Sequence, residues 1–144
     1  MKNFFLSLSF ITVLFSGCDV RKTDHIVRPK TAEKPTFKAH TTVEIIDSVF
    51  DFGKIKEGEM VEFSYRFKNT GKEPLVVVEA LASCGCTVPE KPEKPIEPGE
   101  IGYLKVKFNS DRKPGEAHKT ITVTSNAEPE FPTLLLKGTV IGKD

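Results

Sequence analysis

Apolar and polar residues alternate in short runs along the chain from residue 41 onward. In the run 61–67, the residues Val61, Phe63, Tyr65 and Phe67 are separated by single polar residues, so their side chains share one face of a β-strand. No segment shows the period of about 3.6 residues that indicates a helix. With Gly- and Pro-rich turns between the runs, the pattern predicts an all-β sandwich of about seven short strands. The other strand-like runs are 44–52, 75–81, 104–108, 120–124 and 134–140.

Proline and glycine mark the expected connections. The pairs Pro98-Gly99 and Pro114-Gly115 predict turns, because Pro fixes φ and Gly accepts a positive φ. Residues 89–95 read Pro-Glu-Lys-Pro-Glu-Lys-Pro, a near-repeat that favours an extended, exposed loop between strands. A polyproline II recognition motif is the alternative interpretation of this run.

The N-terminal segment has a different pattern. Residues 1–17 carry a Lys near their start, continue through an apolar stretch and end in small residues, as a secretory signal peptide does. The stretch is shorter than the roughly 18 apolar residues expected of a transmembrane helix. The sequence Phe15-Ser16-Gly17-Cys18 resembles the lipobox of bacterial lipoproteins, with Phe15 where Leu is usual. Cys18 is therefore expected to carry the lipid, palmitate included; an ordinary signal peptide followed by an incidental Cys is the alternative.

Residues 19–40 contain few apolar groups, and their apolar positions follow neither the strand period of two residues nor the helix period of about 3.6. We interpret them as a flexible tether. The expected organisation is a signal peptide (1–17), a lipidated Cys with its tether (18–40) and one β-sandwich domain (41–144). The six basic residues of 19–40 outnumber its three acidic ones, which indicates solvation or, alternatively, attraction to anionic lipid headgroups. Acyl chains hold a protein on a bilayer, so a bacterial membrane is the expected partner. No acidic run follows Asp19, which favours the periplasmic face of the outer membrane.

Length and charge narrow the function classes. A chain of 144 residues has the usual length for one domain. The 21 Lys and Arg against 20 Asp and Glu give a formal net charge of +1, and removing residues 1–17 removes one Lys and no acidic residue. A net charge near zero argues against a nucleic-acid partner, which requires a basic surface.

Five motifs that follow one another along the chain carry a resemblance to a known family. They resemble a bacterial cell-envelope family that is catalogued as a domain of unknown function and is frequent among Bacteroidota lipoproteins. They are also similar to the immunoglobulin-like domains named after hydin (the ASH group) and to the major sperm protein. The resemblance implies an immunoglobulin-like sandwich of about seven strands and no established activity. The motifs are VFDFGKIKEG (49–58), FKNTG (67–71), ASCGCTV (82–88), IEPG (96–99) and LKGTV (136–140).

The sequence Cys84-Gly85-Cys86 is the main candidate for chemistry. In an extended strand, residues i and i+2 lie about 6.6 Å apart at their α-carbons, near the upper limit for a disulfide, and Gly permits the bend that would close one. A secreted protein meets the oxidising compartment that this bond needs. A bridge over three residues adds only about 1.6 kcal/mol of stability. Two free thiols, or a soft-metal (copper or zinc) or redox site, are the alternatives, although a closed zinc site needs four ligands.

Other catalytic patterns are missing from the sequence, so neither an enzyme nor a cofactor is predicted. His118 is the only His in 41–144, and no Gly-x-Ser-x-Gly motif accompanies it. We therefore expect a lipid-anchored binding or scaffolding module that contacts an envelope protein through a strand edge or the loops at one end. A thiol-based metal or redox protein using Cys84 and Cys86 is the alternative, and a purely structural envelope protein is a third hypothesis. The candidate contact segments are 84–88, 89–98 and 112–116.

Overall fold

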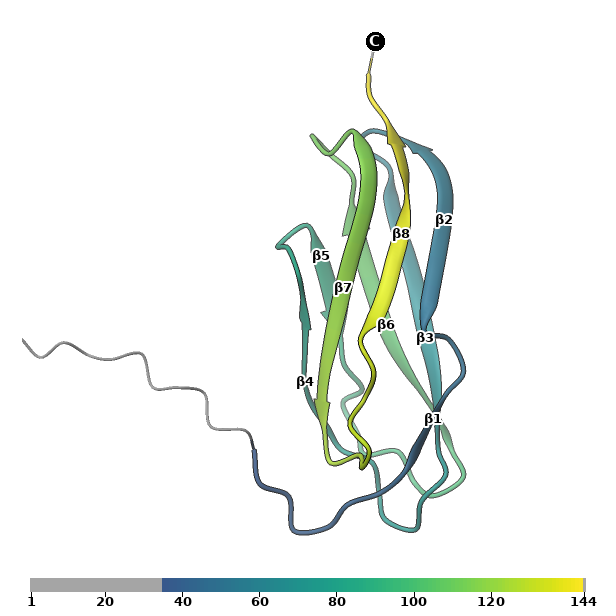
Figure 1. Cartoon of the computed structure of the whole chain (residues 1–144), viewed down its shortest axis with the longest axis vertical. Coiled ribbons are helices and arrows are strands. Elements are labelled where there is room, and N and C mark those ends of the chain that lie inside the picture. The colour runs from purple at the N-terminus through teal and green to yellow at the C-terminus, as the bar shows by residue number, and fades with distance from the viewer. Residues whose placement is uncertain (1–34, 144) are drawn as a thin grey trace, which may run out of the picture. The chain divides into compact units, whose positions relative to one another are not determined.

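The computed structural model describes residues 35–143, which form two β-sheets packed face to face (Figure 1). One sheet has the strand order β1-β3-β6-β5 and the other the order β2-β8-β7-β4. The predicted all-β, immunoglobulin-like sandwich is confirmed, with eight strands among the described residues. No helix in this part of the chain is long and apolar enough to cross a membrane. The strands are β1 (Val43–Ile45), β2 (Val49–Lys56), β3 (Met60–Asn69), β4 (Val77–Ala82), β5 (Thr87–Glu90), β6 (Ile101–Asn109), β7 (Gly115–Ser125) and β8 (Leu134–Ile141).

The core lies between the two sheets and follows the period of two seen in the sequence. On β3, Tyr65 and Phe67 are at most 1 % exposed, whereas Arg66 between them faces solvent. Phe50 of β2 stacks on Phe63 of β3 with ring centroids 3.8 Å apart, so the aromatic side chains connect the sheets. Burying a side chain of this size contributes roughly 1.5–3 kcal/mol. The other large side chains that are fully buried are Leu75, Leu104, Phe108, Ile121, Leu134 and Leu136.

The opening run 44–52, expected as one strand, is two strands in different sheets. β1 pairs antiparallel with β3, and β2 then pairs parallel with β8. Asp47 lies in the connection between β1 and β2, where the chain passes from one sheet to the other. Its carboxylate accepts hydrogen bonds from Arg66 Nε at 2.7 Å and from the Arg66 backbone N–H at 3.1 Å. The Arg66 guanidinium lowers the pKa of Asp47. The expectation of a single strand is wrong because a side chain on the neighbouring strand turns the chain from one sheet to the other.

The Pro-rich run 89–95 is only in part a loop. Pro89 and Glu90 belong to β5, where Pro89 is opposite Val106 of β6. A Pro is tolerated there because β5 is an edge strand and its outer side needs no backbone donor. The expected loop is therefore shorter than the sequence indicated, and it begins after Glu90.

Each of the four edge strands carries a feature that limits pairing with another chain. β1 has only three residues, and β5 has four residues and contains Pro89. β2 is irregular between Asp51 and Lys54, and β4 is irregular between Val77 and Glu79. These features make the strand edges poor surfaces for adding a partner strand and leave the loops at the ends of the sandwich as the better candidates.

Candidate functional site

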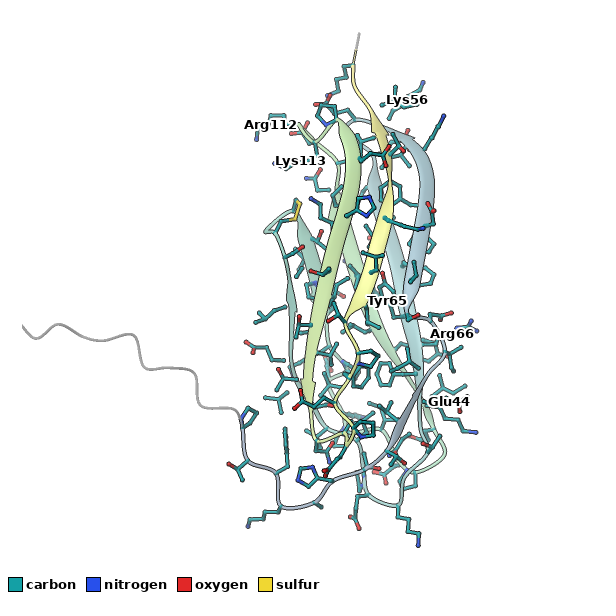
Figure 2. The ribbon with its side chains drawn as sticks, in the orientation of Figure 1. Glu44, Lys56, Tyr65, Arg66, Arg112 and Lys113 are labelled. Carbon is teal, nitrogen blue, oxygen red and sulfur yellow. A yellow bond between two sulfur atoms is a disulfide. The ribbon has the colours of Figure 1, made fainter. Side chains whose placement is uncertain are left out.

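Two of the three candidate segments meet at one end of the sandwich. The disulfide loop (residues 83–86) connects β4 to β5, and the Arg112 turn (residues 110–114) connects β6 to β7. Figure 2 shows Arg112 and Lys113 at this end, whereas the described chain enters at the other end, where Thr41 and Thr42 lie beside residues 70–72. The third segment, 89–98, leads away from the disulfide loop, because Ile96 pairs with Leu75.

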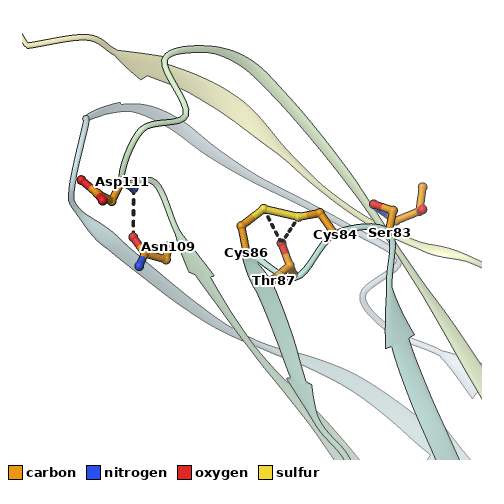
Figure 3. The surroundings of a disulfide bond; sticks show 7 residues. Ser83, Cys84, Cys86, Thr87, Asn109 and Asp111 are labelled. Carbon is orange, nitrogen blue, oxygen red and sulfur yellow. Dashed lines mark hydrogen bonds between the residues drawn. A yellow bond between two sulfur atoms is a disulfide. The ribbon is translucent and has the colours of Figure 1, made fainter.

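The sulfur atoms of Cys84 and Cys86 are joined in a disulfide bond (Figure 3). Their α-carbons are 5.3 Å apart, closer than the roughly 6.6 Å of an extended strand. The chain therefore bends at Gly85, as the sequence required of any bridge here. Within residues 35–143, no group of three or more His, Cys, Asp or Glu side chains could hold a metal ion.

The disulfide loop is attached to both sheets by backbone hydrogen bonds. At its start, Ser83 N–H donates to the carbonyl of Thr120 on β7 at 2.9 Å, and the Ser83 hydroxyl accepts from Thr120 N–H at 3.1 Å. At its end, Asn109 N–H of β6 donates to the carbonyl of Cys86 at 2.9 Å. Between these, Thr87 N–H closes a turn on the carbonyl of Cys84 at 3.2 Å. The loop is thus held in place without any contribution from the sulfur atoms.

Thr87 places its hydroxyl against the disulfide. The residue is 3 % exposed, and its Oγ1 lies 3.6 Å from the Sγ of Cys84 and 4.0 Å from the Sγ of Cys86 (Figure 3). Sulfur is a weak hydrogen-bond partner. A buried hydroxyl that contacts only two weak acceptors within residues 35–143 is unfavourable compared with the methyl group of a Val of the same shape. Packing alone therefore does not explain why this position carries Thr.

The Arg112 turn has its own supports. Ser110 is fully buried, and its hydroxyl accepts from Gly58 N–H at 2.9 Å and donates to the carbonyl of Glu59 at 2.7 Å. Arg112 has φ = 54°, rare for a residue other than Gly, and its N–H donates to a carboxylate oxygen of Glu57 at 2.9 Å. The turn therefore holds the backbone of Arg112 at a fixed place, and its side chain is exposed.

A hollow of about 510 Å³ lies between the disulfide loop and the Arg112 turn. Arg112 pairs with Asp111 at 3.3 Å, while Lys113 forms no ion pair with any of residues 35–143. The hollow is thus polar, with one unpaired cation beside the disulfide. Its lining residues are Gly85, Cys86, Asn109, Asp111, Arg112 and Lys113.

The remaining candidate residues lie elsewhere. Cys18, the expected lipidation site, lies outside the described residues. His118 is exposed on β7. Thr87 and Ser110 were not singled out from the sequence. The position of Thr87 directly after Cys84-Gly85-Cys86 is the one sequence feature that could have marked it as a site residue. Its burial depends on the pairing of β5 with β6, which the sequence does not show.

The sequence profile of a family described as "Protein of unknown function (DUF1573)" matches residues 43–140. The chain belongs to this family. The predicted membership of a family of unknown function is thereby confirmed. No curated protein matches the chain.

Two solved structures share the fold of this family member. A protein of unknown function from Porphyromonas gingivalis W83 is 17 % identical with a TM-score of 0.58, over 74 % of this chain and 49 % of that one. The ASH/PapD-like domain 7 of human CEP192 is 18 % identical with a TM-score of 0.55, over 77 % of this chain and 94 % of that one. The chain thus spans about half the length of the bacterial protein, and identities this low show the fold alone.

Proposed function

We propose that this protein is a lipid-anchored binding module of the bacterial cell envelope. It recognises a partner protein through the end formed by the disulfide loop and the Arg112 turn. The observation that carries the proposal is the polar hollow of about 510 Å³ between these two segments. Cys18 carries the lipid, and the role is one of recognition rather than catalysis.

The position of the hollow supports this role. The two segments that line it, the β4–β5 and β6–β7 connections, lie at the end of the sandwich away from the one where the described chain enters (Figure 1). The entry of the described chain at Thr41 and Thr42 leaves the end with the hollow accessible to a partner protein. The four edge strands are protected against strand addition, so a loop-based contact fits this fold better.

The chemistry of the hollow indicates what it recognises. Arg112 is 88 % exposed at its side chain, and Lys113 has no acidic partner among residues 35–143. Gly85 and Cys86 line the same hollow. An acidic or polar segment of a partner protein complements this surface, and the contact would be polar and hydrated.

Site-specific photo-cross-linking in intact cells at native expression tests the proposal. A photoreactive side chain in place of Lys113 should give a discrete adduct with one envelope protein. The same replacement at Lys72, in the hollow at the opposite end, is the matched control and should give none. The proposal is wrong if Lys113 gives no adduct or if both positions give the same ones.

The anchor requires a separate experiment. A clickable palmitate analogue should label the wild-type protein and leave Cys18→Ser unlabelled, and the variant should leave the membrane fraction. Separation of inner and outer membranes then tests the outer-membrane assignment. Label retained in Cys18→Ser would overturn the lipid anchor without affecting the binding role of the domain.

A further inference from the structure

The disulfide between Cys84 and Cys86 has features that a structural cross-link does not need. It closes a loop of sequence separation 2, so it removes little entropy from the unfolded chain. The loop is already attached to β7 through Ser83 and to β6 through Asn109. The loop therefore has attachments that do not involve the sulfur atoms, and a structural role alone does not explain the pair.

The hydroxyl of Thr87 indicates a further role. It is buried, and its contacts are the two sulfur atoms, at 3.6 Å for Cys84 and 4.0 Å for Cys86. Disulfide sulfur accepts hydrogen bonds weakly, whereas a thiolate is a charged and stronger acceptor. The hydroxyl thus stabilises a thiolate of the reduced pair more than it stabilises the disulfide. Because it lies closer to Cys84 Sγ than to Cys86 Sγ, it favours Cys84 as the leaving thiolate.

The hollow provides access from the other side. Cys86, but not Cys84, lines it, together with Lys113, Arg112 and Asp111, whose carboxylate pairs with Arg112. Figure 3 shows the Cys86 end of the bridge facing the segment with Asn109 and Asp111. A thiolate that enters the hollow is attracted by Lys113, unpaired within residues 35–143, and can attack Cys86 Sγ in line with its bond to Cys84.

We propose that Cys84 and Cys86 form a thiol–disulfide exchange site that accepts two electrons from a protein dithiol. A thiolate of the dithiol attacks Cys86 Sγ and forms a mixed disulfide with it, and the Cys84–Cys86 bond breaks. Cys84 leaves as a thiolate, which accepts a hydrogen bond from the Thr87 hydroxyl. The second thiolate of the dithiol then attacks its own sulfur in the mixed disulfide and releases Cys86. The dithiol becomes a disulfide, and its two protons end on Cys84 and Cys86. Thr87 is a positioning residue in this scheme, and the activity does not depend on the proposed binding role.

The test uses the full chain in detergent micelles and dithiothreitol as the dithiol. Samples are alkylated at intervals at pH 7, and the peptide carrying Cys84 and Cys86 is followed by mass. The bridge should be reduced at least as fast as that of a free peptide of residues 83–87, which has the same chemistry without the fold. A bridge that resists dithiothreitol until the protein is unfolded is a structural cross-link, and this result would falsify the proposal.

Variants of the two supporting groups separate the chemistry from folding. Thr87→Val keeps the shape and should slow reduction about three- to tenfold, the effect of losing one hydrogen bond of ordinary strength. Thr87→Ser keeps the hydroxyl and should restore the rate. The pH at which the reduced thiols become reactive to alkylation should rise in Thr87→Val and not in Thr87→Ser. Equal rates and pH profiles in all three proteins would overturn the role of Thr87.

The cation beside the hollow is tested with a charged thiol. Lys113→Glu should slow reduction by glutathione more than reduction by dithiothreitol, and added salt should remove the difference. The attacking form of glutathione carries net negative charge beyond the thiolate, whereas that of dithiothreitol carries the thiolate charge alone. Lys72→Glu at the opposite end is the matched control and should behave as wild type. If Lys113→Glu and Lys72→Glu have the same effect, attack does not proceed through the hollow.

Discussion

The hydroxyl of Tyr65 donates a hydrogen bond to the backbone carbonyl of Leu135, 2.8 Å away, and this bond connects the two sheets. Tyr65 is fully buried on β3, and burial raises the pKa of its hydroxyl, so it stays protonated and able to donate. Its ring meets Phe63 edge-on with centroids 5.0 Å apart. One side chain therefore fills the core and gives a carbonyl of β8 a donor from the opposite sheet.

Tyr65→Phe should lower the free energy of unfolding by about 0.5–1.5 kcal/mol, because the ring remains while the Leu135 carbonyl loses this donor. Urea unfolding followed by circular dichroism measures the change. The matched control is Tyr103→Phe, at a position that is 55 % exposed, where no change is expected. Equal losses in the two variants would show that the hydrogen bond between the sheets contributes nothing.

The side chain of Asn69 joins three loop segments at the end where the described chain enters: the segment with Thr41, the loop 71–73 and the loop with Ile96. Its Oδ1 accepts from the Thr41 hydroxyl at 2.8 Å and from Gly71 N–H at 3.1 Å. Its Nδ2 donates to the carbonyls of Glu73 at 2.8 Å and Ile96 at 2.9 Å. The side chain is fully buried, so Asn69→Ala leaves several buried polar groups without a partner. We expect a loss of about 3 kcal/mol or more in urea unfolding.

The control for this variant is Asn109→Ala. Asn109 is exposed, and its Oδ1 accepts one local hydrogen bond from Asp111 N–H at 2.9 Å. Its replacement should change the free energy of unfolding by less than about 1 kcal/mol. If Asn69→Ala is no more destabilising than Asn109→Ala, the network around Asn69 does not hold these connections.

The ion pair between Asp47 and Arg66 predicts a pH dependence. The guanidinium of Arg66 lowers the pKa of Asp47 in the folded protein. The pair therefore contributes stability that is fully present above the usual Asp pKa of about 3.9 and is lost as the pH falls through the lowered folded value. Asp47→Asn should reduce the urea midpoint at pH 6 and lose less of it on acidification than wild type. Glu93→Gln, in the exposed loop after β5, is the control and should follow the wild-type curve.

Gly71 lies so close to the N-terminal end of the domain that no side chain fits there. A β-carbon at this position would overlap Thr41 Oγ1 and would lie 2.6 Å from the backbone nitrogen of Thr42. Gly71→Ala should therefore lower the melting temperature by several degrees, because the backbone at Thr42 has to move. Gly85→Ala is the control, since a β-carbon there meets nothing within 4 Å. A similar melting temperature for both variants would show that the loop at Gly71 adapts freely.

The sandwich could be predicted because the period of two is a local property. Val61, Tyr65 and Phe67 are buried on one face of β3 as the alternation indicated. The division of 44–52 into β1 and β2 could not be predicted, because it depends on Asp47 meeting Arg66, which is 19 positions away. Sequence periodicity carries no information about which sheet a strand joins.

The candidate site shows the same limit. Cys84 and Cys86 are visible as a motif, and the need for a bend at Gly85 follows from strand geometry. The approach of Arg112 to the disulfide loop depends on the pairing of β5 with β6, which brings the ends of distant segments together. The burial of Thr87 depends on the same pairing. Residues that act through tertiary contacts are therefore missed, whereas those that form a local motif are found.

The disulfide itself should matter little to the stability of the domain. Its loop is short, and the backbone hydrogen bonds of Ser83, Thr87 and Asn109 hold the segment independently. The double variant Cys84→Ser/Cys86→Ser should fold and lose about 1–2 kcal/mol in urea unfolding, in line with the entropy of a three-residue ring. Reduced wild-type protein is the matched control and should have the stability of the double variant. A loss above about 4 kcal/mol would mean that the bond is a structural cross-link of the kind that small secreted domains need, and an exchange role would then require unfolding at every cycle.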